Sequence, residues 1–210
     1  MSNGTVFGGI ADRYDRLNAV LSLGRDQMWR RAVAARLPRG RVLDLGAGTG
    51  AANEVLAPRE TVALDPAPEM LRLNEAHDRI LAVGEHLPFR DETFDAVFSA
   101  YVFRNLDSVD ATMREIARVL RPRGMAGIVD LGRPVGRAAA RVHRVGTAVV
   151  LPLAGMTIGA RDEYRYLHES LDKHPAPEVL LADSPLELVH TWRMGPLGFV
   201  WGAILCKQAV

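Results

Sequence analysis

A glycine-rich stretch follows a short apolar segment and is the first place where this chain could hold a ligand. Residues 41–52 read RVLDLGAGTGAA. Glycine has no Cβ, so the backbone N–H groups of such a turn can approach a ligand closely. Gly46, Gly48 and Ala51 satisfy the G-x-G-x-x-G/A fingerprint of dinucleotide-binding proteins, but methyltransferases place a similar loop under the amino acid and ribose of S-adenosylmethionine (SAM). The loop alone leaves both ligands open.

An acidic residue further along supports a nucleoside ligand without choosing between these two. Asp65 follows Asp44 by 21 residues and ends the next apolar segment. A carboxylate there can accept hydrogen bonds from both ribose hydroxyls, each worth about 1.5–3 kcal/mol. NAD and SAM both carry that ribose. The alternative role for Asp65 is to cap the helix that begins near Pro66.

Apolar segments and helical patterns alternate along the first 131 residues. Spacings of three and four residues predict a helix over 9–37 that breaks at Gly24 and stops at Pro38 and Gly40. We expect strands over 42–45, 61–64, 80–83, 94–99 and 125–131, and helices over 51–56, after Pro66 and over 108–120, with 121–124 as the exit from the last helix.

This alternation predicts an α/β fold, a Rossmann-like and mostly parallel seven-stranded sheet with helices on both faces. The last two strands come from residues 191–210, which have the aromatic and apolar makeup of closing strands. Ligands of such sheets bind beyond the carboxyl ends of the strands. Five candidate residues lie at those ends: Gly46, Asp65, Gly84, Ser99 and Asp130.

Two features favour SAM over NAD. Dinucleotide-binding domains often begin at the glycine-loop strand, whereas ~30 residues with a helical pattern precede it here. Residues 82–100, AVGEHLPFRDETFDAVFSA, are similar to class I methyltransferases, in which a turn after the third strand contacts adenine and an acidic pair leads into the fourth. We therefore expect a class I methyltransferase with SAM as cofactor.

Three stretches carry a more specific resemblance. They read VFGGIADRYDRLNAVLSLGRDQMWRR at 6–31, VFRNLDSVDATMREIARVLRPRG at 102–124 and YRYLHESLDKHP at 164–175. In this order they resemble the ubiquinone/menaquinone biosynthesis C-methyltransferases, the UbiE/MenG family, over most of the chain. The resemblance implies SAM-dependent methylation of a ring carbon on a lipophilic quinol with an isoprenoid tail.

The resemblance also assigns the cofactor contacts. It gives Thr49, Asp65, the turn at Val83 and Gly84, and Ser99 this role, and we add Asp44, Gly46 and Gly48 of the glycine-loop segment. Tyr14 is similar to a tyrosine that lies across the cofactor mouth in the family, although an aromatic core residue fits its helical spacing equally well. Val83 departs from the family's Asn or Asp and removes an adenine acceptor worth about 0.5–1.5 kcal/mol, for which Glu85 or a backbone carbonyl would compensate.

Arg104, Asn105 and Asp130 are the expected catalytic residues, together with Tyr14. A ring carbon ortho to a hydroxyl becomes nucleophilic when that hydroxyl loses its proton. Arg104 is suited to hold the developing oxyanion, Asn105 the second quinol oxygen, and Asp130 the proton as general base. The plainer alternatives are an ion pair between Arg104 and Asp107 and a turn or helix-cap role for Asn105.

We expect one domain over 1–210, with a helical cap at 1–38 and a substrate lid at 133–170. Arginines recur at about one per helical turn from 133 to 144, ahead of an uncharged run, which indicates either a solvated basic face or a greasy cover that leans on an anionic membrane. We expect a cytoplasmic protein that can contact the inner face of the membrane, and we leave a homodimer open.

Composition narrows the other classes. The net charge of +1 gives no reason to expect nucleic acid as a partner, and the single cysteine, Cys206, rules out a disulfide framework and a cysteine-rich metal site. We expect no metal. The remaining alternatives are a methyltransferase of another hydrophobic small molecule and a non-catalytic SAM-binding member of a quinone-biosynthesis complex.

Overall fold

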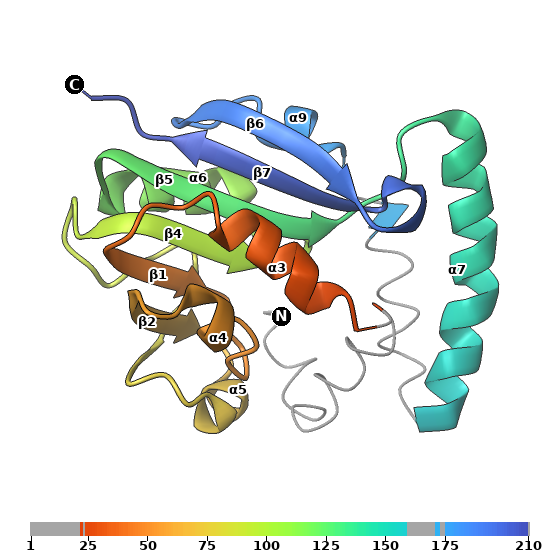
Figure 1. Ribbon diagram of the computed structural model, residues 1–210, viewed down its shortest axis with the longest axis horizontal. Helices are drawn as coiled ribbons and strands as arrows, with labels where there is room; N and C mark the ends of the chain where they lie inside the picture. Colours follow the sequence, from red (N-terminus) through yellow and green to blue (C-terminus); the bar gives the residue numbers. More distant parts are fainter. Residues whose placement is uncertain (1–21, 23, 159–170, 173–174, 210) are drawn as a thin grey trace.

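The computed structural model describes residues 22, 24–158, 171–172 and 175–209, with the backbone alone for 149–158. Tyr14 and most of the helix expected over 9–37 lie outside the described residues, as does the end of the expected lid. The described chain contains a seven-stranded sheet in the order β3-β2-β1-β4-β5-β7-β6 (Figure 1). Its strands are β1 (Arg41–Leu45), β2 (Glu60–Asp65), β3 (Asp78–Leu81), β4 (Phe94–Ala100), β5 (Leu120–Leu131), β6 (Glu187–Met194) and β7 (Val200–Cys206).

The sheet is mostly parallel, as the alternation of elements predicts. β1 pairs in parallel with both β2 and β4, so that Leu43 lies opposite Val62 on one side and Val97 on the other. Among the strands of the described residues, only β7 is antiparallel to its neighbours, β5 and β6. The predicted fold class and the two closing strands are confirmed, and the carboxyl ends of β1, β2, β4 and β5 meet at one edge of the sheet.

Helices cover both faces because residues alternate between the faces along each strand. Trp29 and Val33 of α3 pack against one face, while Met113 and Ile116 of α6 pack against the other. Ser108 caps α6 by accepting a hydrogen bond from the Ala111 amide at 3.1 Å. The helices are α3 (Asp26–Ala34), α4 (Asn53–Leu56), α5 (Pro68–Leu73), η2 (Phe103–Asn105), α6 (Val109–Val119), α7 (Arg137–Ile158), α9 (Pro177–Leu180) and η3 (Pro196–Gly198).

Two predicted boundaries are wrong. The third strand ends at Leu81, so Val83 lies in the following loop. Residues 121–124 belong to β5 and not to a helix exit, because Arg123 and Gly124 exchange backbone hydrogen bonds of 2.9 Å with Lys207 after the last strand. A sequence pattern does not reveal a partner segment more than eighty residues away.

α7 lies beside the edge toward which β1, β4 and β5 point (Figure 1). Arg133 and Arg144 both pair with Asp172, at 2.7 and 3.0 Å, so the start of the expected lid is tied to a residue that follows it in the sequence. Arg137 and Arg141 are exposed. No helix in the described part of the chain has the length and apolar character that a membrane span requires.

Candidate functional site

The glycine loop leaves β1 in a conformation that most residues avoid. The amides of Gly46 and Ala47 donate to the Leu64 carbonyl at 2.8 and 3.0 Å, which holds the loop beside the end of β2. Gly46 has φ +72°, and a Cβ there would overlap Val102 after β4. Gly48 has φ +54°, and no atom lies within 4 Å of the place its Cβ would take. The loop is packed at Gly46 and open at Gly48, where a ligand can reach the backbone.

Asn74, which the sequence reasoning missed, supports the loop from beneath. Its side chain is buried and donates to the Gly48 carbonyl at 3.1 Å, while its Oδ1 accepts from Asn53 at 3.0 Å. An asparagine after a short helical pattern gives no signal that it will meet a loop 26 residues earlier. Only the fold brings the two together.

Asp65 closes the opposite side of the loop. Its Oδ2 accepts from the Gly48 amide at 2.8 Å and its Oδ1 from the Ala67 amide at 2.9 Å, so the helix-capping role and the loop contact occur together. Burial raises the pKa of this carboxyl, and the two amide bonds counteract part of that rise. A carboxylate has about four acceptor positions, so Asp65 keeps room for ribose hydroxyls.

The loop after β3 is held against the start of α6. A Cβ on Gly84 would lie 3.1 Å from the side chain of Thr112, so the backbone at Gly84 comes this close to α6 because glycine has no Cβ. Val83 is exposed beside it. The carboxylate of Glu85 accepts from the amides of Asp107 and Ser108 at 3.0 and 3.2 Å. Its Oε1 therefore binds the backbone that leads into α6. Glu85 is thus a poorer candidate for the adenine acceptor that Val83 does not supply.

Ser99 and Asp44 are buried within the sheet. The Ser99 hydroxyl donates to the Leu45 carbonyl at 3.0 Å and is buried between β4 and β1, so a contact with the cofactor would come from its backbone. Asp44 is 1% exposed, and its Oδ2 has no hydrogen-bond partner among the described residues. Burial raises the pKa of Asp44 to about 7, against the attraction of Arg30.

Arg104 and Asp130 form a buried ion pair at the carboxyl ends of β4 and β5. The guanidinium Nη1 lies 2.6 Å from Oδ1 of Asp130, with side chains 8% and 1% exposed. The amides of Leu131 and Arg104 also donate to this carboxylate, at 2.7 and 3.3 Å. The alternative pair with Asp107 is thus not the one that forms. Asn105 donates to the Tyr101 carbonyl at 3.3 Å and so also supports the turn after β4.

Tyr101 is a second residue that sequence reasoning missed. It has φ +65°, which is unusual for a bulky side chain, and its amide donates to the Val129 carbonyl at 2.8 Å. Its buried hydroxyl has no hydrogen-bond partner among the described residues, and burial raises its pKa. Backbone strain and an unsatisfied hydroxyl at one residue are typical of functional sites.

These residues fit SAM. The open backbone at Gly48 suits a closely bound ligand, Asp65 has acceptor capacity for a ribose, and the unsatisfied oxygen of Asp44 suits a cationic group. Thr49 follows Gly48 in the same loop, in which the amides of Gly46 and Gly48 donate to Leu64 and Asp65 at the end of β2. These residues lie where the carboxyl ends of β1, β2, β4 and β5 meet, which we call the ligand edge. The sheet order and the ligand edge together define a class I SAM-dependent methyltransferase.

Comparison with known proteins also indicates a SAM-dependent methyltransferase and identifies its family. Residues 2–184 match the ubiE/COQ5 methyltransferase family, and the chain belongs to that family. It is 40% identical to a demethylmenaquinone methyltransferase of Corynebacterium urealyticum over 84% of this chain and 80% of that one. It is 41% identical to the Thermus thermophilus protein of the same name, over 84% and 88%.

Solved structures agree on the fold. A SAM-dependent methyltransferase from Thermotoga maritima has a TM-score of 0.70 at 16% identity and covers 98% of this chain and 100% of its own. One from Aquifex aeolicus has a TM-score of 0.57 at 16% identity, over 91% and 97%. The expected family, fold, enzyme class and cofactor are therefore confirmed.

Proposed function

We propose that this enzyme methylates a ring carbon of a demethylmenaquinol, the reduced form of a quinone with an isoprenoid tail. The observation that carries the proposal is the buried pair of Arg104 and Asp130 at the ligand edge of the sheet. The names of the relatives, demethylmenaquinone methyltransferase, give the substrate class. Bound SAM supplies a methyl group already activated by its positive sulfur.

In this proposal Arg104 stabilises the charge that develops on the substrate. A guanidinium stays cationic at any working pH and offers several donors, so Arg104 can bind Asp130 and still reach a quinol oxygen. The ion pair is almost fully excluded from solvent, which strengthens its electrostatic effect on a neighbouring phenolate. Stabilising that phenolate makes the adjacent ring carbon nucleophilic.

We assign two roles to Asp130. It fixes Arg104 through the 2.6 Å ion pair. It is also the general base that we expect to accept the proton of the quinol hydroxyl. Its oxygens already accept hydrogen bonds from a guanidinium and two amides, which leaves fewer acceptor positions for a substrate hydroxyl. We therefore give the larger share of catalysis to Arg104. Asn105, in the same turn, remains our candidate for binding the second quinol oxygen.

The test separates charge stabilisation from folding. We expect Arg104→Gln to lower kcat by about 100-fold or more while the affinity for S-adenosylhomocysteine stays within about 2-fold. Removing one member of a buried pair also costs about 3–5 kcal/mol of stability. The double variant Arg104→Gln/Asp130→Asn removes the uncompensated charge, so it should regain stability without regaining activity.

Arg114→Gln is the matched control, because Arg114 forms an exposed pair with Asp110 on α6. It should leave turnover and stability nearly unchanged. Normal turnover of the Arg104→Gln variant would refute the role of this arginine.

We further propose that residues 133–170 act as the lid over the substrate and that α7 meets the membrane surface from which a lipophilic quinol arrives. Arg137 and Arg141 are exposed on α7, and Val142 and Val145 beside them are 64% and 62% exposed. Cations next to exposed apolar side chains suit an interface of anionic lipid. A homodimer stays an open alternative for how the protein assembles.

A further inference from the structure

Few side chains attach α7 to the rest of the molecule. The helix stands beside the ligand edge (Figure 1), and over residues 137–148, where its side chains are described, none is buried. Four are half-buried: Ala139, Ala140, His143 and Thr147. His143 and Thr147 are four residues apart and so share one face of the helix. An attachment of this kind depends on polar contacts more than on a hydrophobic core.

Arg133, which follows β5, contacts both of these polar side chains. Its Nη1 lies 3.2 Å from Nδ1 of His143 and donates to the hydroxyl of Thr147 at 3.0 Å. Its Nε donates to Asp172 at 2.7 Å. The Arg133 side chain is 15% exposed, so solvent screens these contacts only weakly. One guanidinium thus ties α7 to the end of a central strand.

The contact with Arg133 fixes the protonation state of His143. A guanidinium has donors and no acceptor, so Nδ1 of His143 must accept this hydrogen bond. Only the neutral imidazole with its proton on Nε2 has a lone pair on Nδ1. Protonation would replace the hydrogen bond by a contact between two cations at 3.2 Å.

The charges around this imidazole do not favour a further cation. Asp172 already pairs with Arg133 and Arg144, at 2.7 and 3.0 Å. Arg193 of β6 adds a third cation, since its Nη1 donates to the Arg133 carbonyl at 3.4 Å, and Glu178 offsets part of that charge. Among the described residues, three arginines therefore face two carboxylates before the imidazole takes a proton.

Phe199, at the start of β7, positions the imidazole without fixing its charge. The ring centres of Phe199 and His143 are 5.2 Å apart and their planes differ by 24°. Phe199 in turn packs edge-on against Trp29 of α3, with ring centres 5.8 Å apart. An aromatic face accepts a neutral ring or a cation. The dependence of the attachment on pH therefore comes from Arg133.

We propose that α7 is attached through a pH-sensitive latch, in which neutral His143 accepts a hydrogen bond from Arg133 and protonation of His143 releases the helix. An imidazole in solvent takes up a proton below about pH 6.5. The detached helix can bind that proton, whereas the attached helix loses its contact on doing so, and acid therefore favours detachment. The latch itself does not depend on the proposed function. Only its effect on turnover rests on α7 acting as the lid.

Double electron–electron resonance on the full chain would measure this attachment. Cys206→Ser removes the native thiol, and spin labels at Val145→Cys on α7 and Arg114→Cys on α6 report the distance between the two helices. Both labelled positions are exposed. We expect one narrow distance distribution at pH 8. At pH 5 the ratio of attached to detached helix should be lower by about 10- to 30-fold.

Two variants in this labelled background separate the halves of the latch. Glutamine in His143→Gln can accept from Arg133 through Oε1 and does not titrate, so its distance distribution should stay narrow at pH 8 and pH 5. Arg133→Gln removes the guanidinium and should broaden the distribution at both pH values.

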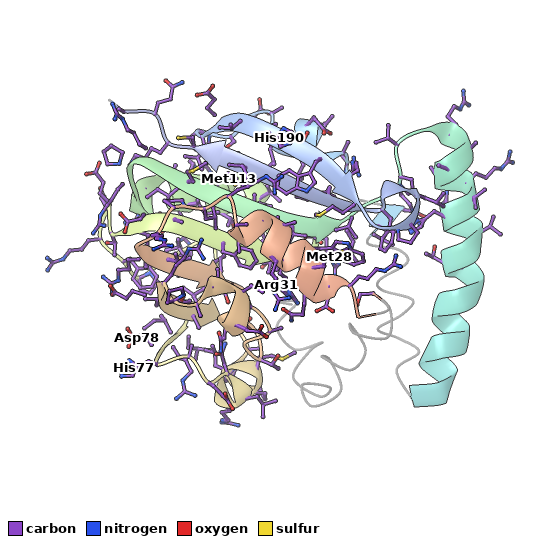
Figure 2. All side chains as sticks on the ribbon, viewed as in Figure 1. Met28, Arg31, His77, Asp78, Met113 and His190 are labelled. Atoms are coloured by element: carbon purple, nitrogen blue, oxygen red, sulfur yellow. The ribbon has the colours of Figure 1, made fainter. Side chains whose placement is uncertain are left out.

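His77→Gln is the matched control. His77 is also hydrogen-bonded through Nδ1, with Oδ1 of Asp78 at 2.7 Å. It is exposed and lies on the side of the molecule away from α7 (Figure 2). This variant should keep the pH response of the wild type.

Three results would overturn the latch. They are a wild-type distribution that stays narrow at pH 5, an equal broadening on acidification in His143→Gln and the wild type, and a narrow distribution for Arg133→Gln at pH 8. None of them depends on methyl transfer. The expected distances in a protein that methylates no quinol would support the latch and contradict the proposed function.

Discussion

Two buried carboxylates at the ligand edge, Asp44 and Asp130, meet opposite electrostatic conditions. Asp130 pairs with Arg104 at 2.6 Å and accepts hydrogen bonds from the backbone. Asp44 is buried with one oxygen unsatisfied among the described residues, and its pKa rises to about 7. We propose a catalytic role for the first and the binding of a charged ligand for the second. The difference comes from neighbours that lie far apart in sequence.

Asp44 should make the stability of the cofactor-free protein depend on pH. Its ordinary pKa of 3.8 rises to about 7 on folding, so the native state binds more protons than the unfolded chain between these values. The free energy of unfolding should therefore fall as the pH rises from 4 to 7. We expect Asp44→Asn to flatten this slope and to be more stable than the wild type at pH 8 by about 2 kcal/mol.

Urea unfolding at pH 5 and pH 8 would measure this effect. Asp110→Asn, an exposed carboxylate on α6, is the control and should keep the slope of the wild type. Some slope should remain in Asp44→Asn, since burial also raises the pKa of Asp65. An unchanged slope in Asp44→Asn would contradict the account of this residue.

Among the elements, α3 contacts both the core of the sheet and the candidate site. It covers one face of the sheet through Trp29 and Val33 and brings Arg30 to the ligand edge. Its close approach to β5 requires Gly127, where a Cβ would lie 2.8 Å from Val33 and 3.0 Å from Leu37. Glycine at 127 is thus a packing requirement of the helix.

Gly127→Ala should destabilise the protein by about 1–3 kcal/mol, because the added methyl overpacks this contact. The double variant Gly127→Ala/Val33→Ala should lose less stability than the sum of the two single variants, since the smaller side chain makes room for the methyl. Urea unfolding of all three variants would measure this coupling. Additive losses would mean that Val33 is not the limiting contact.

The elements also show how far sequence reasoning reaches. Short apolar runs predict the strands, Pro68 marks the start of α5, and Ser108 caps α6, because these signals are local. The glycine loop and Asp65 are recognisable for the same reason. Asn74, Arg30 and Tyr101 are not, because their roles depend on partners from distant segments. The extension of β5 through 121–124 depends in the same way on Lys207.

At the scale of the whole molecule, the ligand edge and α7 lie on the same side of the sheet (Figure 1). If α7 meets a membrane, as we propose, a lipophilic substrate would arrive on this side of the sheet. The net charge of +1 supplies no strong field, so contact with lipid would depend on the local cations Arg137 and Arg141.

Vesicle sedimentation would test this placement. We expect binding to vesicles rich in anionic lipid, weak binding to neutral ones, and a loss of about 1 kcal/mol for each of Arg137→Gln and Arg141→Gln. Binding should also weaken as salt is added. Equal binding to neutral and anionic vesicles, or no effect of the two substitutions, would refute a role for this face of α7.

A turnover assay with the purified protein tests the proposed reaction. Purified protein would be mixed with SAM and a reduced, short-tailed demethylmenaquinol, and both S-adenosylhomocysteine and the mass of the product would be measured. The account predicts a quinone heavier by one methyl group, with the methyl on a ring carbon, formed in step with S-adenosylhomocysteine. If SAM binds but no quinol gains a methyl group, the proposed substrate is wrong.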